Sequence, residues 1–139
     1  MDIRTPQGQA ITRWEEWTRP KRDYQWKEGR SAMELAKAWF STGQLAVPQE
    51  LTAILDREPR LEGLVFQQAI PELVTRLPER GEGRNHDLWL LGRTNREQVT
   101  VCVEAKADES FGDNTVGGYL QQCLRRRQRG EATRAPRPG

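Results

Sequence analysis

Residues 85–107 constrain the fold of this chain more than any other segment. Two apolar runs rich in strand-forming residues, 88–91 and 99–103, flank the polar tetrapeptide Thr94-Asn95-Arg96-Glu97. β-Branched and aromatic residues favour strands, and the composition of residues 94–97 is typical of a turn. We therefore predict two strands joined at residues 94–97, paired as an antiparallel hairpin.

Charged residues gather at the open end of this predicted hairpin. Asp87 starts the first strand, and Glu104 and Lys106 follow the second. Side chains alternate between the two faces of a strand, so Glu104 and Lys106 share one face. Antiparallel pairing carries Asp87 back beside Glu104. The sequence thus predicts two carboxylates and one ammonium group at one end of an apolar sheet.

This cluster has two interpretations, and the residues alone leave both open. One is an ion pair at a strand end, with carboxylates that face solvent. The other is a divalent metal site, because paired carboxylates are hard oxygen ligands for Mg²⁺, which keeps waters and accepts phosphate oxygens. A neighbouring lysine would then orient the attacking water and offset charge on the phosphate.

The order Asp87, strand-turn-strand, Glu104-Ala105-Lys106 resembles the signature of the PD-(D/E)xK, or restriction-endonuclease-like, nuclease superfamily. His86 replaces the proline that often precedes the aspartate. Residues 26–32 (WKEGRSA) and 85–88 (NHDL) are also similar to an uncharacterised bacterial domain family associated with that superfamily, over most of residues 14–120.

The resemblance implies hydrolysis of DNA or RNA with Mg²⁺ or Mn²⁺ as cofactor. Asp87 and Glu104 would hold the metal, and Lys106 would position the hydrolytic water. The superfamily also carries an acidic residue on the helix before the sheet, which makes Glu34 a third candidate metal ligand. Glu34 has an alternative role as the capping partner of Ser31, three residues earlier.

Helices are predicted at residues 31–42, which end before Gly43, and at 48–57, where Pro48 suits the first helical position. Residues 64–70 are predicted as a strand that runs on past Pro71, with a helix over 62–69 as the alternative.

Glu72 follows that proline and is a further candidate to face the acidic cluster. A third helix is predicted after Asp113, Asn114 or Thr115, any of which can cap it, with apolar positions Val116, Tyr119, Leu120, Cys123 and Leu124. By the resemblance, Gln121 and Gln122 on that helix are candidate substrate-binding residues.

We predict three regions: an irregular N-terminal arm (1–29), one nuclease-like domain (30–124) and a disordered basic tail (125–139). The arm carries Trp14, Trp17 and Trp26 among basic residues. Such tryptophans either stack nucleobases or pin the arm to the core.

The predicted fold class is α/β (α+β), with a restriction-endonuclease-like core: N-terminal helices, a three-stranded mainly antiparallel sheet and a following helix. The superfamily core runs α-β-β-β-α-β, and no fourth strand is found after Leu124, so the chain is expected to be truncated at its C-terminus. Two alternatives to a nuclease follow: an inactive nuclease-like module that binds nucleic acid or protein, and a fragment without a function of its own.

Composition excludes several classes. The 139 residues carry a net charge of +2, too small by itself to argue for nucleic acid. One histidine and two cysteines give neither a zinc pattern nor a disulfide framework. Because no apolar run approaches about 20 residues, no membrane span is expected, and a cytoplasmic protein is predicted. DNA versus RNA and the oligomeric state stay open.

Overall fold

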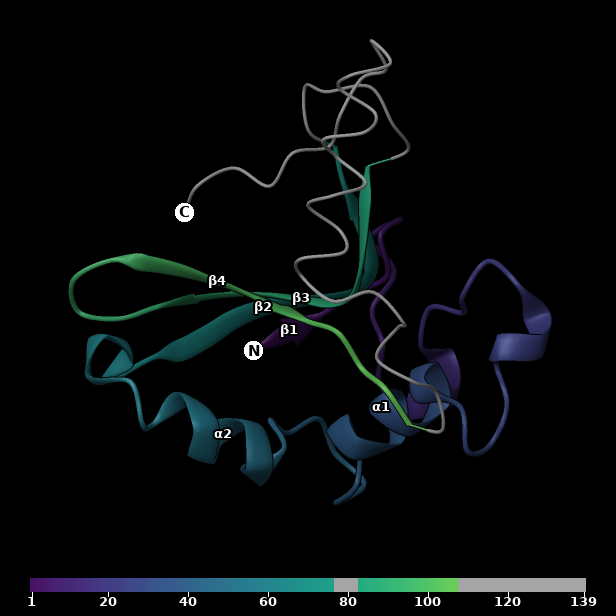
Figure 1. Cartoon of the computed structure of the whole chain (residues 1–139), viewed down its shortest axis with the longest axis horizontal. Coiled ribbons are helices and arrows are strands. Elements are labelled where there is room, and N and C mark those ends of the chain that lie inside the picture. The colour runs from purple at the N-terminus through teal and green to yellow at the C-terminus, as the bar shows by residue number, and fades with distance from the viewer. Residues whose placement is uncertain (77–82, 108–139) are drawn as a thin grey trace, which may run out of the picture.

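In the part of the chain that this computed structural model describes, a four-stranded sheet with both α-helices on one side forms the framework (Figure 1). The structure describes residues 1–76 and 83–107. The elements of the framework are β1 (Asp2–Ile3), α1 (Ser31–Trp39), α2 (Gln49–Leu55), β2 (Val65–Thr75), β3 (Arg84–Arg93) and β4 (Gln98–Val103).

The strands follow the order β1-β2-β3-β4. β2, β3 and β4 form an antiparallel meander, and β1 lies parallel to β2, with Ile3 opposite Ala69. The mixed α+β class is confirmed, but the prediction of three strands is wrong by one. β1 is only two residues long, too short for any periodicity to reveal it. This topology does not by itself confirm the nuclease-like core.

The predicted hairpin and its turn are confirmed. β3 and β4 pair from Leu88 opposite Val103 to Arg93 opposite Gln98. The N–H of Thr94 donates to the carbonyl oxygen of Glu97 at 2.9 Å and closes the turn. Along β4, partly buried valines alternate with exposed residues, as the period of two requires.

β2 runs through Pro71, which excludes the alternative helix over residues 62–69. The carbonyl of Ala69 accepts a hydrogen bond from the N–H of Arg4. The backbone N–H and C=O groups of alternate residues point to the same side of a strand, so those of residues 69 and 71 both point toward β1. β1 ends at Ile3, opposite Ala69, so Pro71 lies beyond it and its missing N–H interrupts no pairing with β1. Glu72 follows with a φ of 55°, a left-handed conformation that strains a residue other than glycine.

The core lies between α1 and the sheet. α1 buries Ala36 and Trp39 in the same cluster as Ala69, Leu88 and Leu90 of the sheet. The N-terminal arm joins this cluster through three buried apolar residues, Ile3, Ile11 and Trp17. The arm is therefore part of the packed structure, and Trp17 pins it to the core.

The start of α1 differs from the predicted capping box. Ser31 is the first helical residue, and Arg30 occupies the N-cap position without a side-chain cap. The Glu34 carboxylate instead accepts a hydrogen bond from the N–H of Gly29 at 3.0 Å. α2 begins after Pro48 rather than at it. The predicted third helix and the tail lie outside the described residues.

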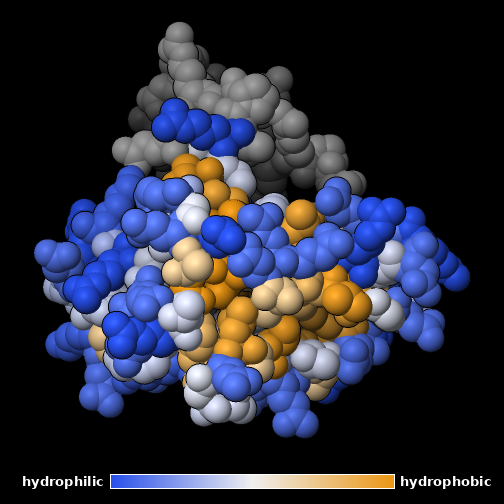
Figure 2. All heavy atoms as spheres, turned by 180° about the vertical axis from the view of Figure 1, so that it is seen from behind, coloured by the Kyte–Doolittle hydropathy of each residue, from blue (hydrophilic) through white to orange (hydrophobic). Residues whose placement is uncertain are grey.

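Apolar side chains also reach the surface. Seen from behind the view of Figure 1, a group of apolar residues lies in the middle of the face and hydrophilic residues surround it (Figure 2). Among the residues that the structure describes, no helix combines the length and the apolar character needed to cross a membrane.

Candidate functional site

Three carboxylates occupy one row across the sheet: Glu72 lies inside β2, Asp87 lies inside β3 rather than at its start, and Glu104 follows the end of β4. The pairing of Leu88 with Val103 continues to Asp87 and Glu104, which therefore lie opposite each other. On the other side of β3, the pairs Pro71–Leu88 and Leu73–His86 put Glu72 at the position opposite Asp87. We call Glu72, Asp87 and Glu104 the acidic row.

Hydrogen bonds fix the orientation of two members of the acidic row. The Asp87 Oδ2 atom accepts a bond from the backbone N–H of Ala105 at 2.7 Å. The Asn85 side chain donates to Oε2 of Glu72 at 2.7 Å. Lys106 completes the cluster, because its Nζ lies 3.5 Å from Oε1 of Glu104. The structure thus brings together Asp87, Glu104 and Lys106, as the hairpin pattern predicts, and also Glu72, the further candidate from the sequence.

The acidic row carries more negative charge than its surroundings stabilise. Burial raises the pKa of Asp87, and the Glu104 carboxylate raises it further, against the opposing effects of the Ala105 N–H and Lys106. Burial likewise raises the pKa of Glu72; the Asn85 hydrogen bond opposes this rise, while Asp87 and Glu104 add to it. A bound cation would relieve both effects.

The sole histidine of the chain lies beside the row without joining it. His86 Nε2 shares a 2.8 Å hydrogen bond with the Thr75 hydroxyl, across β3 and β2. Burial lowers the pKa of His86, and neighbouring Arg84 lowers it further. The bond to Thr75 joins the His86 ring to the neighbouring strand β2.

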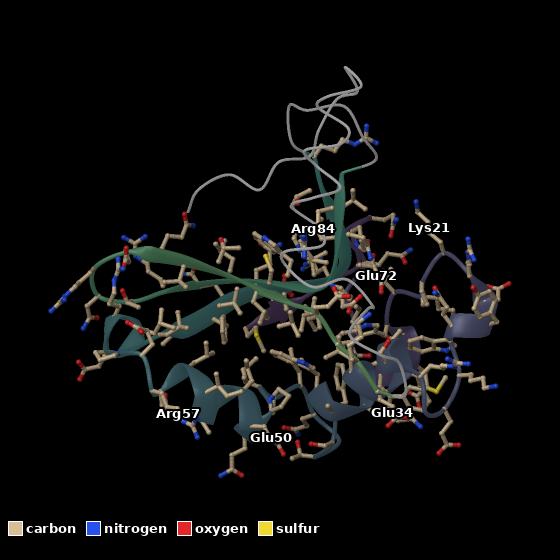
Figure 3. The ribbon with its side chains drawn as sticks, viewed as in Figure 1. Lys21, Glu34, Glu50, Arg57, Glu72 and Arg84 are labelled. Carbon is tan, nitrogen blue, oxygen red and sulfur yellow. The ribbon has the colours of Figure 1, made fainter. Side chains whose placement is uncertain are left out.

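The row opens into a cleft of about 410 Å³. One wall is made by the acidic row and Lys106. Polar and basic residues that precede or begin α1 line the other wall, among them Lys21, Arg22, Tyr24, Arg30 and Ser31. Figure 3 labels Glu72 on β2 and Lys21 on the loop that lines the other wall. The cleft therefore has an acidic wall and a basic wall.

The donor set decides which metals suit this cleft. Carboxylate oxygens are the ligands that Mg²⁺ and Mn²⁺ prefer. In residues 1–76 and 83–107, no group of three or more His, Cys, Asp and Glu is close enough together to hold a metal ion. A metal bound by Asp87 and Glu104 would keep several waters. That arrangement fits Mg²⁺ or Mn²⁺ and does not fit zinc, which takes three or four protein ligands.

Comparison with known proteins gives a family. The model of a domain of unknown function, DUF6946, matches residues 8–135. The chain belongs to this family. No curated protein and no solved structure matches the chain. The family does not connect the chain to the PD-(D/E)xK superfamily, so that resemblance remains an interpretation of residues 85–107.

The other predicted site residues, Glu34, Gln121 and Gln122, are not among the described residues that line the cleft. Glu34 is not among the residues that line the cleft. Its carboxylate bonds to the N–H of Gly29 and lies 3.8 Å from Nζ of Lys37, which accounts for its position. Figure 3 shows Glu34 on α1, apart from Glu72. Gln121 and Gln122 lie outside the described residues.

The basic wall of the cleft was not found from the sequence. Residues 20–30 have no helix or strand periodicity, so nothing indicates where the side chains of Lys21, Arg22 and Tyr24 point. The sequence indicated the tryptophans of the arm as candidates for stacking on bases, but in the structure they pack within the molecule. Trp17 is buried, and the rings of Trp14 and Trp26 lie 6.4 Å apart.

Cations cover both of these partly exposed rings. Lys37 Nζ lies 5.2 Å from the centre of Trp14, and the Arg19 guanidinium lies 5.6 Å from that of Trp26. Such cation–π contacts support packing of the arm rather than base stacking by its tryptophans.

Proposed function

We propose that this protein is a metal-dependent phosphodiesterase that hydrolyses nucleic acid, with Mg²⁺ or Mn²⁺ held by Asp87 and Glu104. One observation carries the proposal: the acidic row faces a cleft, with Lys106 3.5 Å from Glu104. Like charges directly opposite each other destabilise a sheet. A cation between them would turn this repulsion into attraction.

Asp87 and Glu104 differ in how each would bind the metal. Asp87 is oriented because its Oδ2 accepts the Ala105 N–H, which leaves Oδ1 for a metal. The Glu104 side chain is 56% exposed, so a ligand in the cleft can reach it. Glu72 is held by Asn85 and adds negative charge beside them. When bound, the metal supplies Lewis-acid polarisation of a phosphate oxygen and lowers the pKa of a water.

Lys106 acts on the water and the phosphate. Its ammonium group has three donors and no acceptor, so it can hold the attacking water by its oxygen. The same charge stabilises the negative charge that builds on the phosphate oxygens. Ala105, between the two reactive residues, contributes the backbone N–H that fixes Asp87.

A second candidate is a module that keeps this cleft to bind nucleic acid or a protein without hydrolysis. The observation in its favour is that the described residues hold no group of three metal ligands. Such a module would bind its partner in the presence of a chelator and would not need Lys106 for chemistry.

Cleavage assays separate the two candidates. The wild-type chain should cleave plasmid DNA or a labelled oligonucleotide of DNA or RNA in Mn²⁺, and EDTA should abolish cleavage. Lys106→Met keeps much of the side-chain length and removes the ammonium group. It should lose cleavage yet retain the rise in melting temperature that Mn²⁺ produces.

Lys27→Met is the matched control, because Lys27 is exposed and does not line the cleft. Its cleavage rate should equal that of the wild type. Cleavage that survives Lys106→Met would remove the proposed role of this lysine. Binding of nucleic acid in EDTA, without cleavage of any substrate in Mn²⁺, would favour the binding module.

A further inference from the structure

We propose that residues 20–25, the basic loop, hold an unpaired nucleic-acid strand, with Tyr24 stacked on a base and Lys21 and Arg22 contacting its phosphates. This inference rests on the proposed function, because it names the form of substrate that the same cleft takes.

Tyr24 is the exposed aromatic ring of this cleft. It lies in the short 3₁₀ helix η2 (Asp23–Gln25), and 62% of its surface is exposed. Large aromatic rings usually bury their faces, as Trp17 does in the core of this chain. An aromatic ring that lines a cleft and stays exposed offers a stacking surface to a ligand.

A neighbouring arginine holds the Tyr24 ring. Arg22 Nη1 donates to the Tyr24 hydroxyl oxygen at 3.0 Å. This bond ties the ring to a cation, so a base stacked on the ring lies beside a positive charge. A nucleotide can then stack its base on the Tyr24 ring while its phosphate contacts the Arg22 guanidinium.

The charges of the basic loop suit a polyanion. Lys21 and Arg22 are exposed and line the wall opposite the acidic row. Within the described residues, neither forms a salt bridge with a carboxylate of the fold. Phosphate contacts of this kind release counterions and make binding weaken as salt rises.

Stacking on Tyr24 decides between a single strand and a duplex. The faces of bases inside a duplex are covered by their neighbours, whereas an unpaired base can present its face to an aromatic ring. A cleft of about 410 Å³ is in the size range of small-ligand sites and suits a nucleotide unit rather than a duplex. The basic loop would thus hold the strand while the acidic row faces a phosphate.

Fluorescence anisotropy of the full chain in EDTA tests this inference without hydrolysis. The probes are a short labelled single-stranded DNA, the RNA of the same sequence, and the DNA duplex. At least one of the two single strands should bind more tightly than the duplex. Tyr24→Ala should weaken single-strand binding about tenfold, while Tyr24→Phe, which keeps the ring, should stay within about twofold of wild type.

Two further variants sharpen the test. Lys21→Ala with Arg22→Ala should make the plot of log affinity against log salt less steep by about one to two units. Ile54→Ala is the control, because Ile54 is an exposed apolar residue that does not line the cleft, and its affinity should match wild type.

The inference is overturned by equal affinity of wild type and Tyr24→Ala, by a preference for duplex, or by no binding of any probe. None of these results bears on Asp87 and Glu104, whose metal binding is read from Mn²⁺-dependent melting. Single-strand binding that depends on Tyr24, in a protein that shows no response to Mn²⁺, would keep this inference and overturn the proposed hydrolysis.

Discussion

The two ends of the β3–β4 hairpin treat polar groups in opposite ways. At the turn, the Thr94 hydroxyl accepts N–H bonds from Arg96 at 3.2 Å and Glu97 at 3.1 Å and donates to the carbonyl of Glu97 at 3.3 Å. Thr94 is only 6% exposed, and its polar side-chain atom is satisfied. At the other end, the acidic row lines up three carboxylates with one nearby ammonium group.

This difference separates what the fold needs from what a ligand needs. The turn closes the hairpin, and each of its bonds stabilises the folded chain. The acidic row has the opposite effect, because like charges on adjacent strands repel and the burial of charge costs free energy. Groups with perturbed pKa values that line a cleft are typical of functional sites.

The largest expected effect comes from the strand that joins the two ends. Leu90 lies in the middle of β3 and is fully buried. Leu90→Ala should lower the free energy of unfolding by about 2–5 kcal/mol through lost burial and a cavity. Urea unfolding measures this loss. Val65→Ala, at a position that is 65% exposed, should change stability by about 0.5 kcal/mol or less.

Removal of the Thr94 hydroxyl tests the turn end alone. Thr94→Val keeps the shape of the side chain and leaves two N–H groups without their acceptor. It should cost about 1–3 kcal/mol in urea unfolding, with an unchanged response of the melting temperature to Mn²⁺. Loss of the Mn²⁺ response in this variant would show that the two ends are not independent.

Two substitutions of Asp87 separate its hydrogen bond from its charge. Asp87→Asn keeps an oxygen acceptor for the Ala105 N–H and removes the repulsion from Glu104. Asp87→Ala removes both. Without metal, Asp87→Asn should be more stable than Asp87→Ala by about 1 kcal/mol, the usual value of one hydrogen bond. Equal stabilities in urea unfolding would contradict the role assigned to the Ala105 contact.

The smallest expected effect is the pH dependence of stability that the acidic row contributes. Because the pKa of Asp87 and of Glu72 is raised on folding, the folded chain binds more protons than the unfolded chain between the unfolded and the folded pKa. Without metal, the contribution of these groups to stability should therefore fall as pH rises through that window.

Urea unfolding at a series of acidic to neutral pH values measures this slope. Glu72→Gln should make it less steep, because one of the two raised carboxyl groups is gone. Thr94→Val removes no titratable group and should leave it unchanged. A slope that Glu72→Gln does not alter would mean that this carboxyl group is ionised equally easily in both states.

The part of the site that depends on strand periodicity could be predicted from the sequence. The period of two along each strand was enough to place Asp87 opposite Glu104. Glu72, the residue after Pro71, was a candidate to face the same cluster, and it lines the cleft. α1 begins at Ser31, as predicted, but its N-cap is Arg30, the Glu34 carboxylate bonds to Gly29, and the helix ends at Trp39 instead of residue 42. Helix ends depend on such local choices of partner.

Two features of the fold had no signal in the sequence. β1 is a strand because Ile3 pairs with Ala69, more than sixty residues later in the sequence. The composition of residues 2 and 3 does not indicate a strand. The basic loop takes its position from packing around it, where Trp26 contacts Trp14 and Arg19. Tertiary contacts of this kind leave no local pattern to read.

Glu34→Gln decides whether α1 takes part in a metal site. Its carboxylate is already bonded to Gly29 and close to Lys37, so the substitution should leave the rise in melting temperature with Mn²⁺ intact. A loss of that rise would return Glu34 to the set of metal ligands.

Thermal melting of wild type and Asp87→Asn, with and without Mn²⁺, tests the central claim that the acidic row is a metal site. A metal at 100 times its dissociation constant, bound only by the folded chain, adds about 2.7 kcal/mol and raises the melting temperature by several degrees. Wild type should show this rise and Asp87→Asn should not. No rise in wild type, or an equal rise in both proteins, would contradict the account.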